Sequence, residues 1–246
     1  MTPTDPILAK VRKLLALAED PAATSHEAET YTAKAAQLIA DYGIDRALLA
    51  QADPGSDPVG DLVVSLDAPY AVDKAELLST VAARLRCVAV QRTSRGAGGK
   101  ELSMHLFGHA SDLERAELLF TSLLLQSAQG LARTPVPAWE HKAAFRRSWL
   151  AGFRGAVGAR LLAAEQRAAD RADARFAEGG TTTAVVLADR TAQVEAAMHD
   201  TYPDLRTARP RVLSGSGGAA GWAAGHRADL GDGPARVGGG RTALGG

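Results

Sequence analysis

The sequence has little of several features that would mark a function class. A single cysteine, Cys87, stands among 246 residues, so no internal disulfide can form, and this suits a reducing compartment. Aromatic residues make up only 5% of the chain, and 28 lysines and arginines balance 28 aspartates and glutamates. Because the chain carries no net charge, a role on nucleic acid or a membrane surface would need a local basic patch.

The sequence also lacks a long apolar run. The most apolar helical segment, at about residues 113–131, contains Glu114, Arg115 and Glu117, which excludes a membrane span. Met1 is followed by the polar run Thr2–Asp5, and no basic stretch leads into an apolar core, so no secretory signal is recognisable. These absences predict a cytoplasmic protein with no membrane contact.

The composition itself is that of a folded protein. Hydrophobic residues make up 46% and charged residues 23% of the chain, close to globular averages. Widespread disorder is therefore excluded, and the core must be built mainly from leucine, valine and alanine.

Regularly spaced apolar residues near the N-terminus predict an antiparallel helical hairpin. In Ile7–Ala18 they recur at three- and four-residue spacing, as on one face of a helix. Thr24 and Glu27 match a capping box for a second helix, which we expect to end at Gly43 as its C-terminal cap. A short third helix is expected over Asp45–Leu49. The short connection between the first two helices makes them pack antiparallel.

The hairpin segment also carries a family resemblance. Val11–Asp45 contains a Lys-Leu-Leu-Ala-Leu-Ala run, a His-Glu-Ala loop and a Tyr-Gly-Ile ending. In these features it resembles the bacterial and phage family called domain of unknown function 2786 (DUF2786). Phe107–Phe120 and Phe145–Phe153 resemble the companion domain that often follows it. The resemblance implies a fold and brings no established catalytic residues.

Beyond a linker at residues 51–58, the patterns predict a mixed body of helices and strands. Short β-prone runs are expected to form strands at Asp61–Leu66, Cys87–Gln91, Glu101–Phe107 and Thr182–Leu187. Possible capping boxes, Asp73 with Glu76 and Ser111 with Glu114, begin two helices, and Asp189 is expected to cap another.

A long helix is predicted from about Glu140 to Phe176. Its apolar stripe consists of Trp149, Phe153, Val157, Leu161, Ala164 and Ala168. Each of three glycines near its middle would weaken an isolated helix by about 1 kcal/mol relative to alanine. Their presence predicts that another element packs closely there, and a small-residue helix is expected around Trp222.

Together the elements predict a helix-rich α+β fold with three parts. These are an N-terminal helical hairpin domain at 5–50, an α+β domain with a small sheet and a long central helix at 59–230, and a flexible glycine-rich tail at 231–246.

The candidate binding residues are arginines gathered in two segments. They are Arg146, Arg147, Arg154, Arg160 and Arg167 on the long helix, and Arg206, Arg209 and Arg211 in an extended segment. Residues 146, 160 and 167 share a helix face because they stand whole heptads apart, and such a stripe can follow a phosphate backbone. Glu165 and Asp170 interleave with it, so a solvated or internally paired face is the alternative.

His105 and His109 share a face of their predicted strand, and Asp112 follows nearby. These residue types can bind zinc. The sequence has no His-Glu-x-x-His motif and no Cys/His quartet, so structural roles are the alternative, and no metal or cofactor is assigned. Cys87 is expected to be inert in the core.

We therefore expect a non-catalytic binding or accessory module with nucleic acid as the leading partner. Two alternatives stay open. One is a metal-assisted hydrolase that uses His105 and His109. The other is a protein-binding module that docks through the hairpin, in which case Tyr31 or Leu38 would be exposed.

Overall fold

The computed structural model describes residues 6–19, 25–96, 99–175, 182–207, 209 and 211–228. Within them the elements follow in the order α1 (Pro6–Glu19), α2 (Ser25–Ala52), the 3-10 turn η1 (Pro54–Ser56), β1 (Val59–Leu66), α3 (Ala71–Arg84), β2 (Val88–Gly96), β3 (Gly99–His109), α4 (Ala110–Arg133), α5 (Lys142–Arg175), α6 (Thr183–Thr201) and α7 (Gly218–Arg227). This is the helix-rich α+β fold that the sequence predicts. No helix in the described part is both long enough and apolar enough to cross a membrane.

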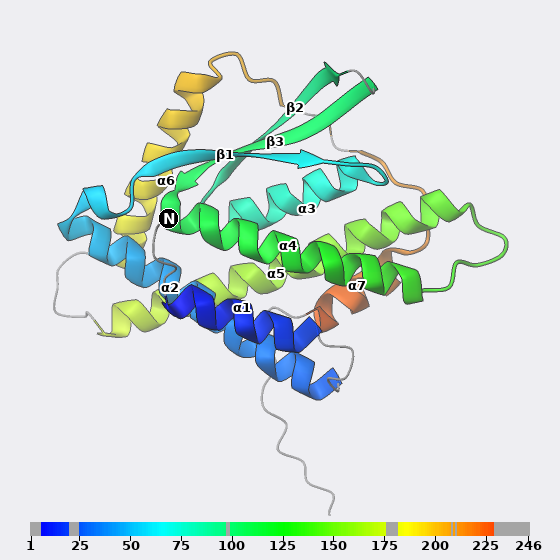
Figure 1. Cartoon of the computed structure of the whole chain (residues 1–246), viewed down its shortest axis with the longest axis horizontal. Coiled ribbons are helices and arrows are strands. Elements are labelled where there is room, and N and C mark those ends of the chain that lie inside the picture. The colour runs from blue at the N-terminus through cyan, green and yellow to red at the C-terminus, as the bar shows by residue number, and fades with distance from the viewer. Residues whose placement is uncertain are drawn as a thin grey trace, which may run out of the picture.

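The predicted N-terminal hairpin is confirmed, with α1 and α2 side by side (Figure 1). Leu8, Val11 and Leu15 of α1 are buried at helical spacing. The predicted end of the second helix at Gly43 is wrong, because α2 continues to Ala52 and absorbs the expected third helix at Asp45–Leu49. The Thr24–Glu27 capping box depends on side chains outside the described set.

The body contains a three-stranded antiparallel sheet in the order β1-β3-β2. One of its faces presents Met104 and Leu106 to the core under α3 and α4, and its other face presents Val90 and Phe107 to α6. Figure 1 shows the sheet, the layer of α3, α4 and α5, and the α1–α2 hairpin in succession. The predicted β2–β3 hairpin is confirmed, and its pairing includes Gly96 opposite Gly99.

The helical hairpin and the body share their apolar core. Val11, Leu15 and Ile39 belong to the same buried cluster as Leu106 and Trp149. The boundary between a domain at 5–50 and a domain at 59–230 stays a prediction, and the tail at 231–246 lies outside the described residues. The short Asp- and Pro-rich connection expected to be a linker holds a side chain, Asp57, that is only 1% exposed.

Two predicted capping boxes are wrong, because their side chains bond to residues distant in sequence and not to the first turn of the helix. No side-chain cap bonds the first turn of α3, and Asp73 and Glu76 instead accept hydrogen bonds from Arg211. At the start of α4, the amide and hydroxyl of Ser111 donate to Asp57, while Glu114 pairs with Arg12.

The strand predicted at Thr182–Leu187 is also wrong, because this segment begins α6. The amide of Thr183 donates to Asp173 at 2.7 Å where the helix starts. Val186, Arg190, Val194 and Met198 are buried at four-residue spacing, so burial of one helix face outweighs the β-branched character of the run. Asp189 lies inside α6 and caps nothing.

The long central helix α5 and the close packing at its glycines are confirmed. The predicted stripe from Trp149 to Ala168 is buried. A Cβ at Gly152 would overlap the backbone carbonyl of Gly218, and one at Gly155 would press on the Trp222 ring. These glycines therefore allow α7, the small-residue helix predicted around Trp222, to pack closely against α5.

Candidate functional site

The predicted basic residues of α5 differ in how far they are exposed to solvent and in which groups they contact. Arg147 is exposed, whereas Arg146 is half-buried, and its buried Nε has no hydrogen-bond partner in the described part of the chain. Arg154 pairs with Glu76. Further along, Arg160 donates to carbonyls at the C-terminal end of α7, those of Gly225, His226 and the capping residue Ala228. Arg167 is exposed.

In the second predicted segment, Arg211 lies against the start of α3. Arg206 and Arg209 are exposed. Arg211 donates from Nη2 to Asp73 at 2.7 Å and from Nε to Glu76 at 2.8 Å. Glu76 therefore accepts from an arginine of each predicted segment, and this places the segments side by side.

The two arginines also change the protonation of Glu76. Partial burial alone would raise the pKa of this carboxyl. The hydrogen bond from Arg211 and the charges of Arg154 and Arg211 outweigh burial, so the pKa of Glu76 lies below its usual value. The pKa of Arg211 is raised, chiefly by its hydrogen bond to Glu76. These groups therefore stay charged at neutral pH.

A cavity of about 560 Å³ opens beside Arg146. Its walls come from α4, from the turn that leads into α3 and from α5, and they include Tyr70, Lys74, Leu124, Leu131, Arg146 and Leu150. The lining is mostly apolar, and its two charged residues are both cations. We call this cavity the Arg146 pocket.

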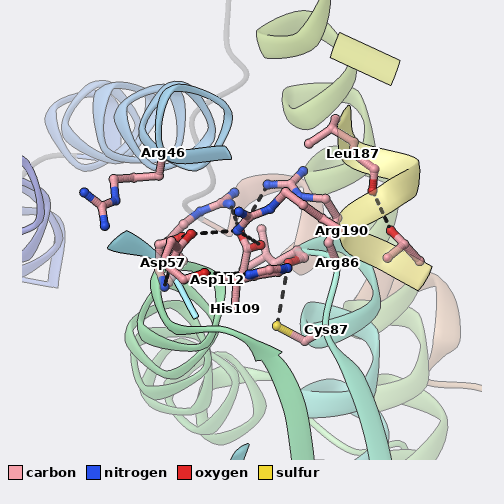
Figure 2. Close-up of polar contacts among 12 residues, drawn as sticks. Arg46, Asp57, Arg86, Cys87, His109, Asp112, Leu187 and Arg190 are labelled. Carbon is pink, nitrogen blue, oxygen red and sulfur yellow. Dashed lines mark hydrogen bonds and ion pairs between the residues drawn. The ribbon is translucent and has the colours of Figure 1, made fainter. Parts of the chain in front are cut away.

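A second candidate site is a charge network in the interior, which we call the buried network. It comprises three carboxylates and three arginines, namely Asp57, Asp112, Glu165, Arg86, Arg115 and Arg190. Figure 2 shows Asp57, Asp112, Arg86 and Arg190 converging from different elements around the start of α4. Asp112 and Arg115 are fully buried.

Each carboxylate of the buried network has at least two partners. Asp112 accepts from Arg115 at 2.6 Å and from Arg86 at 3.2 Å, and Glu165 pairs with the same two arginines. Asp57 accepts from Ser111 and from Arg190 at 2.7 Å. Burial alone would raise the pKa of Asp57, but these hydrogen bonds and the charge of Arg190 lower it overall. The three positive and three negative charges of the buried network therefore neutralise one another within the protein.

The glycine at the end of the hairpin motif contacts this network. A Cβ at Gly43 would overlap the guanidinium of Arg115. The Tyr-Gly-Ile motif, which is read from the sequence as a helix end, therefore contains a position in mid-helix where only a hydrogen fits. Gly43 allows α2 to pass directly over the buried arginine.

A smaller cavity of about 350 Å³ borders the buried network. It lies between α2 and α6, and Asp57, His109 and Arg190 contribute to its wall. Arg190 is already engaged by Asp57 and Asp112, so this wall offers an incoming anion no uncommitted arginine.

His105, His109 and Asp112 do not meet as a metal site. His105 Nε2 donates to the Asp61 carboxylate at 2.8 Å, and its Nδ1 contacts the Tyr202 hydroxyl at 2.7 Å. His109 Nδ1 donates to the backbone carbonyl of Asp57. Asp112 accepts hydrogen bonds from Arg115 and Arg86. Among the described residues, no three His, Cys, Asp or Glu side chains are placed to hold a metal ion.

Cys87 is buried, as predicted, and its sulfur points toward His109 (Figure 2). Burial, together with the nearby Asp112 charge, raises the pKa of the Cys87 thiol to about 12. The thiolate is the reactive form of cysteine, so this arrangement does not make Cys87 a nucleophile at neutral pH.

The protein-docking alternative expects Tyr31 or Leu38 of the hairpin to be exposed. Tyr31 and Leu38 are both half-buried, and Leu38 packs against the main core. Neither side chain therefore has the exposure that this alternative expects.

The buried network as a whole has no recognisable signal in the sequence. Its ion pairs join residues up to 133 positions apart, and a buried arginine has no local pattern that separates it from an exposed one. The buried stripe of α6, once its helical period is recognised, is the signal that places Arg190 inside.

The fold and these sites define a helix-rich α+β protein with a helical hairpin seated on a buried charge network. Residues 7–46 match the model of the family described as protein of unknown function (DUF2786). The match falls on the N-terminal hairpin, whose motifs predict this resemblance. The companion domain stays a prediction. No curated protein and no solved structure gives a significant match to the chain.

Proposed function

We propose that the protein is a non-catalytic accessory module that binds the phosphate backbone of a nucleic acid. Its contact surface would be the basic face, defined here as Lys74, Arg146, Arg147, Arg154, Arg206, Arg209 and Arg211. The observation that carries this proposal is the shared pairing of Arg154 and Arg211 with Glu76, which joins the two arginine segments. Arg147 lies one heptad before Arg154 on α5 and is exposed toward solvent.

An exposed aromatic side chain adds support. Trp139, in the connection between α4 and α5, is 80% exposed. The next residue, Glu140, accepts hydrogen bonds from the amide and hydroxyl of Ser216, so the connection is tied to the chain just beyond Arg211. Proteins that bind nucleic acid strands combine cationic grooves with aromatic side chains on which bases stack.

Two of the predicted arginines fall outside this surface. Arg160 is committed to the end of α7, so its replacement would disturb the fold, and Arg167 lies in the distal half of α5. A test should therefore reverse charges at Arg147, Arg206 and Arg209, which are exposed.

The test measures binding of fluorescein-labelled 20-nucleotide DNA, single-stranded and duplex, by fluorescence anisotropy in 50 mM NaCl. We expect the triple variant Arg147→Glu, Arg206→Glu, Arg209→Glu to weaken binding at least about tenfold, because phosphate contacts dominate affinity. The control variant Arg84→Glu, Arg92→Glu, Arg95→Glu has the same net charge, and its three reversals lie at exposed positions of α3 and β2.

Retention of affinity in the control and loss in the test variant would support the basic face. No binding of either DNA by the wild-type protein, or equal losses in both variants, would reject the proposal.

A further inference from the structure

The Arg146 pocket lies within the basic face. Lys74 and Arg146 belong to both, and Arg211 pairs with Asp73, the residue before Lys74 in the first turn of α3. The pocket therefore opens between α4, α5 and the start of α3, next to the residue that pairs with Arg211.

The pocket lining combines apolar walls with two cationic side chains. Leu124, Leu131 and Leu150 provide apolar walls, and Tyr70 provides an aromatic ring. The Ser127 hydroxyl donates to the carbonyl of Leu124, so its oxygen can accept a hydrogen bond from a ligand. The two charges in the lining are positive, and the Arg146 Nε is buried without a hydrogen-bond partner in the described part of the chain. Lys74 donates to the carbonyl of Asp67 at 2.8 Å and has two further protons to donate.

Such a lining suits a flat group of low polarity that is attached to an anion. A cavity of about 560 Å³ falls within the usual range of small-molecule sites, roughly 300–1,000 Å³. A nucleobase has two apolar faces and a polar edge, and in a nucleic acid it is linked to a phosphate. The walls match the faces of a base, Ser127 matches its edge, and Lys74 and Arg146 match the phosphate.

We infer that the Arg146 pocket receives one unstacked base of a single-stranded nucleic acid, with the adjoining phosphate held by Arg146 and Lys74. This inference rests on the proposed function and narrows it to single strands. A base in a duplex would have to leave its stack and its pairing partner, at a cost of a few kcal/mol, whereas a base in a single strand avoids most of that cost.

Binding of the base and binding of the phosphates can be measured separately with two probes that carry equal charge, of which only one has bases. One is fluorescein-labelled dT12, and the other is a 12-unit abasic strand of the same length. The wild-type protein should bind dT12 roughly 5- to 150-fold more tightly than the abasic strand, because contact with one base typically contributes 1–3 kcal/mol.

A pocket-filling variant completes the design. Ala128 lines the pocket and is exposed on α4, so Ala128→Phe should occupy the cavity and still allow folding. Ala184→Phe, at an exposed position of α6, is the matched control. We expect Ala128→Phe to reduce dT12 affinity to the abasic level and Ala184→Phe to leave it unchanged, with thermal unfolding of both variants measured alongside.

Equal affinity of the wild-type protein for dT12 and the abasic strand would overturn the inference and leave the proposed function standing. Unchanged dT12 affinity in folded Ala128→Phe would do the same. No binding of either strand would overturn the inference, and the proposed function would fall with it only if the protein also failed to bind the 20-nucleotide duplex.

Discussion

The buried network and the basic face use the same side chain for opposite purposes. In the network, three arginines meet three carboxylates inside the protein, and Arg115 and Asp112 have no solvent exposure. On the basic face, Arg147, Arg206 and Arg209 are exposed. Arg154 and Arg211 share Glu76, and Arg211 also pairs with Asp73.

The difference shows that arginine content alone does not indicate binding. A buried ion pair is costly to disrupt, because the remaining charge is left without a partner in a medium of low polarity. An exposed arginine contributes little to stability and can exchange water for a phosphate. Removing a network charge should therefore affect folding, whereas removing an exposed cation should affect binding.

The largest effect is expected from Gly43→Ala. The new methyl group would overlap the Arg115 guanidinium, which is fixed by Asp112 and Glu165 and cannot move aside. We expect a loss of about 4 kcal/mol or more in the free energy of unfolding, measured in urea, or failure to fold. Gly60→Ala is the control, because its Cβ would lie 3.9 Å from Leu113. A normal unfolding midpoint for Gly43→Ala would contradict the packing of α2 over the network.

Next in size is Arg115→Leu. It leaves Asp112 and Glu165 with Arg86 as their main shared partner and should cost about 3–5 kcal/mol by the same urea measurement. Arg12→Leu, which removes an exposed pair with Glu114, should cost at most about 1 kcal/mol. Similar losses in the two variants would refute the contrast between interior and surface arginines.

A smaller, pH-dependent effect is expected for Glu76→Gln. Because the pKa of Glu76 is lower in the folded protein than its ordinary value of 4.5, its contribution to stability is present above pH 4.5 and is lost as the pH falls through the folded pKa. We expect the variant to lose about 1 kcal/mol or less at pH 7 and to show a shallower loss of stability below pH 4.5. Thermal unfolding from pH 7 to pH 3 measures this, and parallel curves for the two proteins would argue against the shifted pKa.

The smallest effect on stability is expected for Trp139→Ala. An indole that is 80% exposed contributes little to the core, so the melting temperature should stay within about 2 °C of the wild-type value. If bases stack on it, affinity for single-stranded DNA should fall roughly fivefold or more in fluorescence anisotropy. Unchanged affinity would remove Trp139 from the binding surface.

The parts of the fold that follow from local periodicity could be predicted from the sequence. The stripe of α5 and the leucines of α1 specify buried helix faces, and the glycines of α5 indicate a close neighbour before α7 is seen. The Thr182–Leu187 run could not be assigned this way, because its β-branched residues favour a strand until the sheet beneath α6 is known.

The candidate sites were only partly predictable. The basic segments could be read from the arginine spacing, but their meeting at Glu76 depends on α3, whose acidic residues read locally as a cap. Gly43 resembles a helix end because the residue that requires it, Arg115, is distant in sequence. In each case a tertiary contact outweighs a valid local preference.

The salt dependence of DNA binding tests the central claim most directly. The affinity of the wild-type protein for a fluorescein-labelled 20-nucleotide single strand would be measured from 25 to 300 mM NaCl. Contact with three to five phosphates predicts that log K falls against log [NaCl] with a slope of about −2 to −3.5. A slope near zero, or no binding at 25 mM NaCl, would contradict the account.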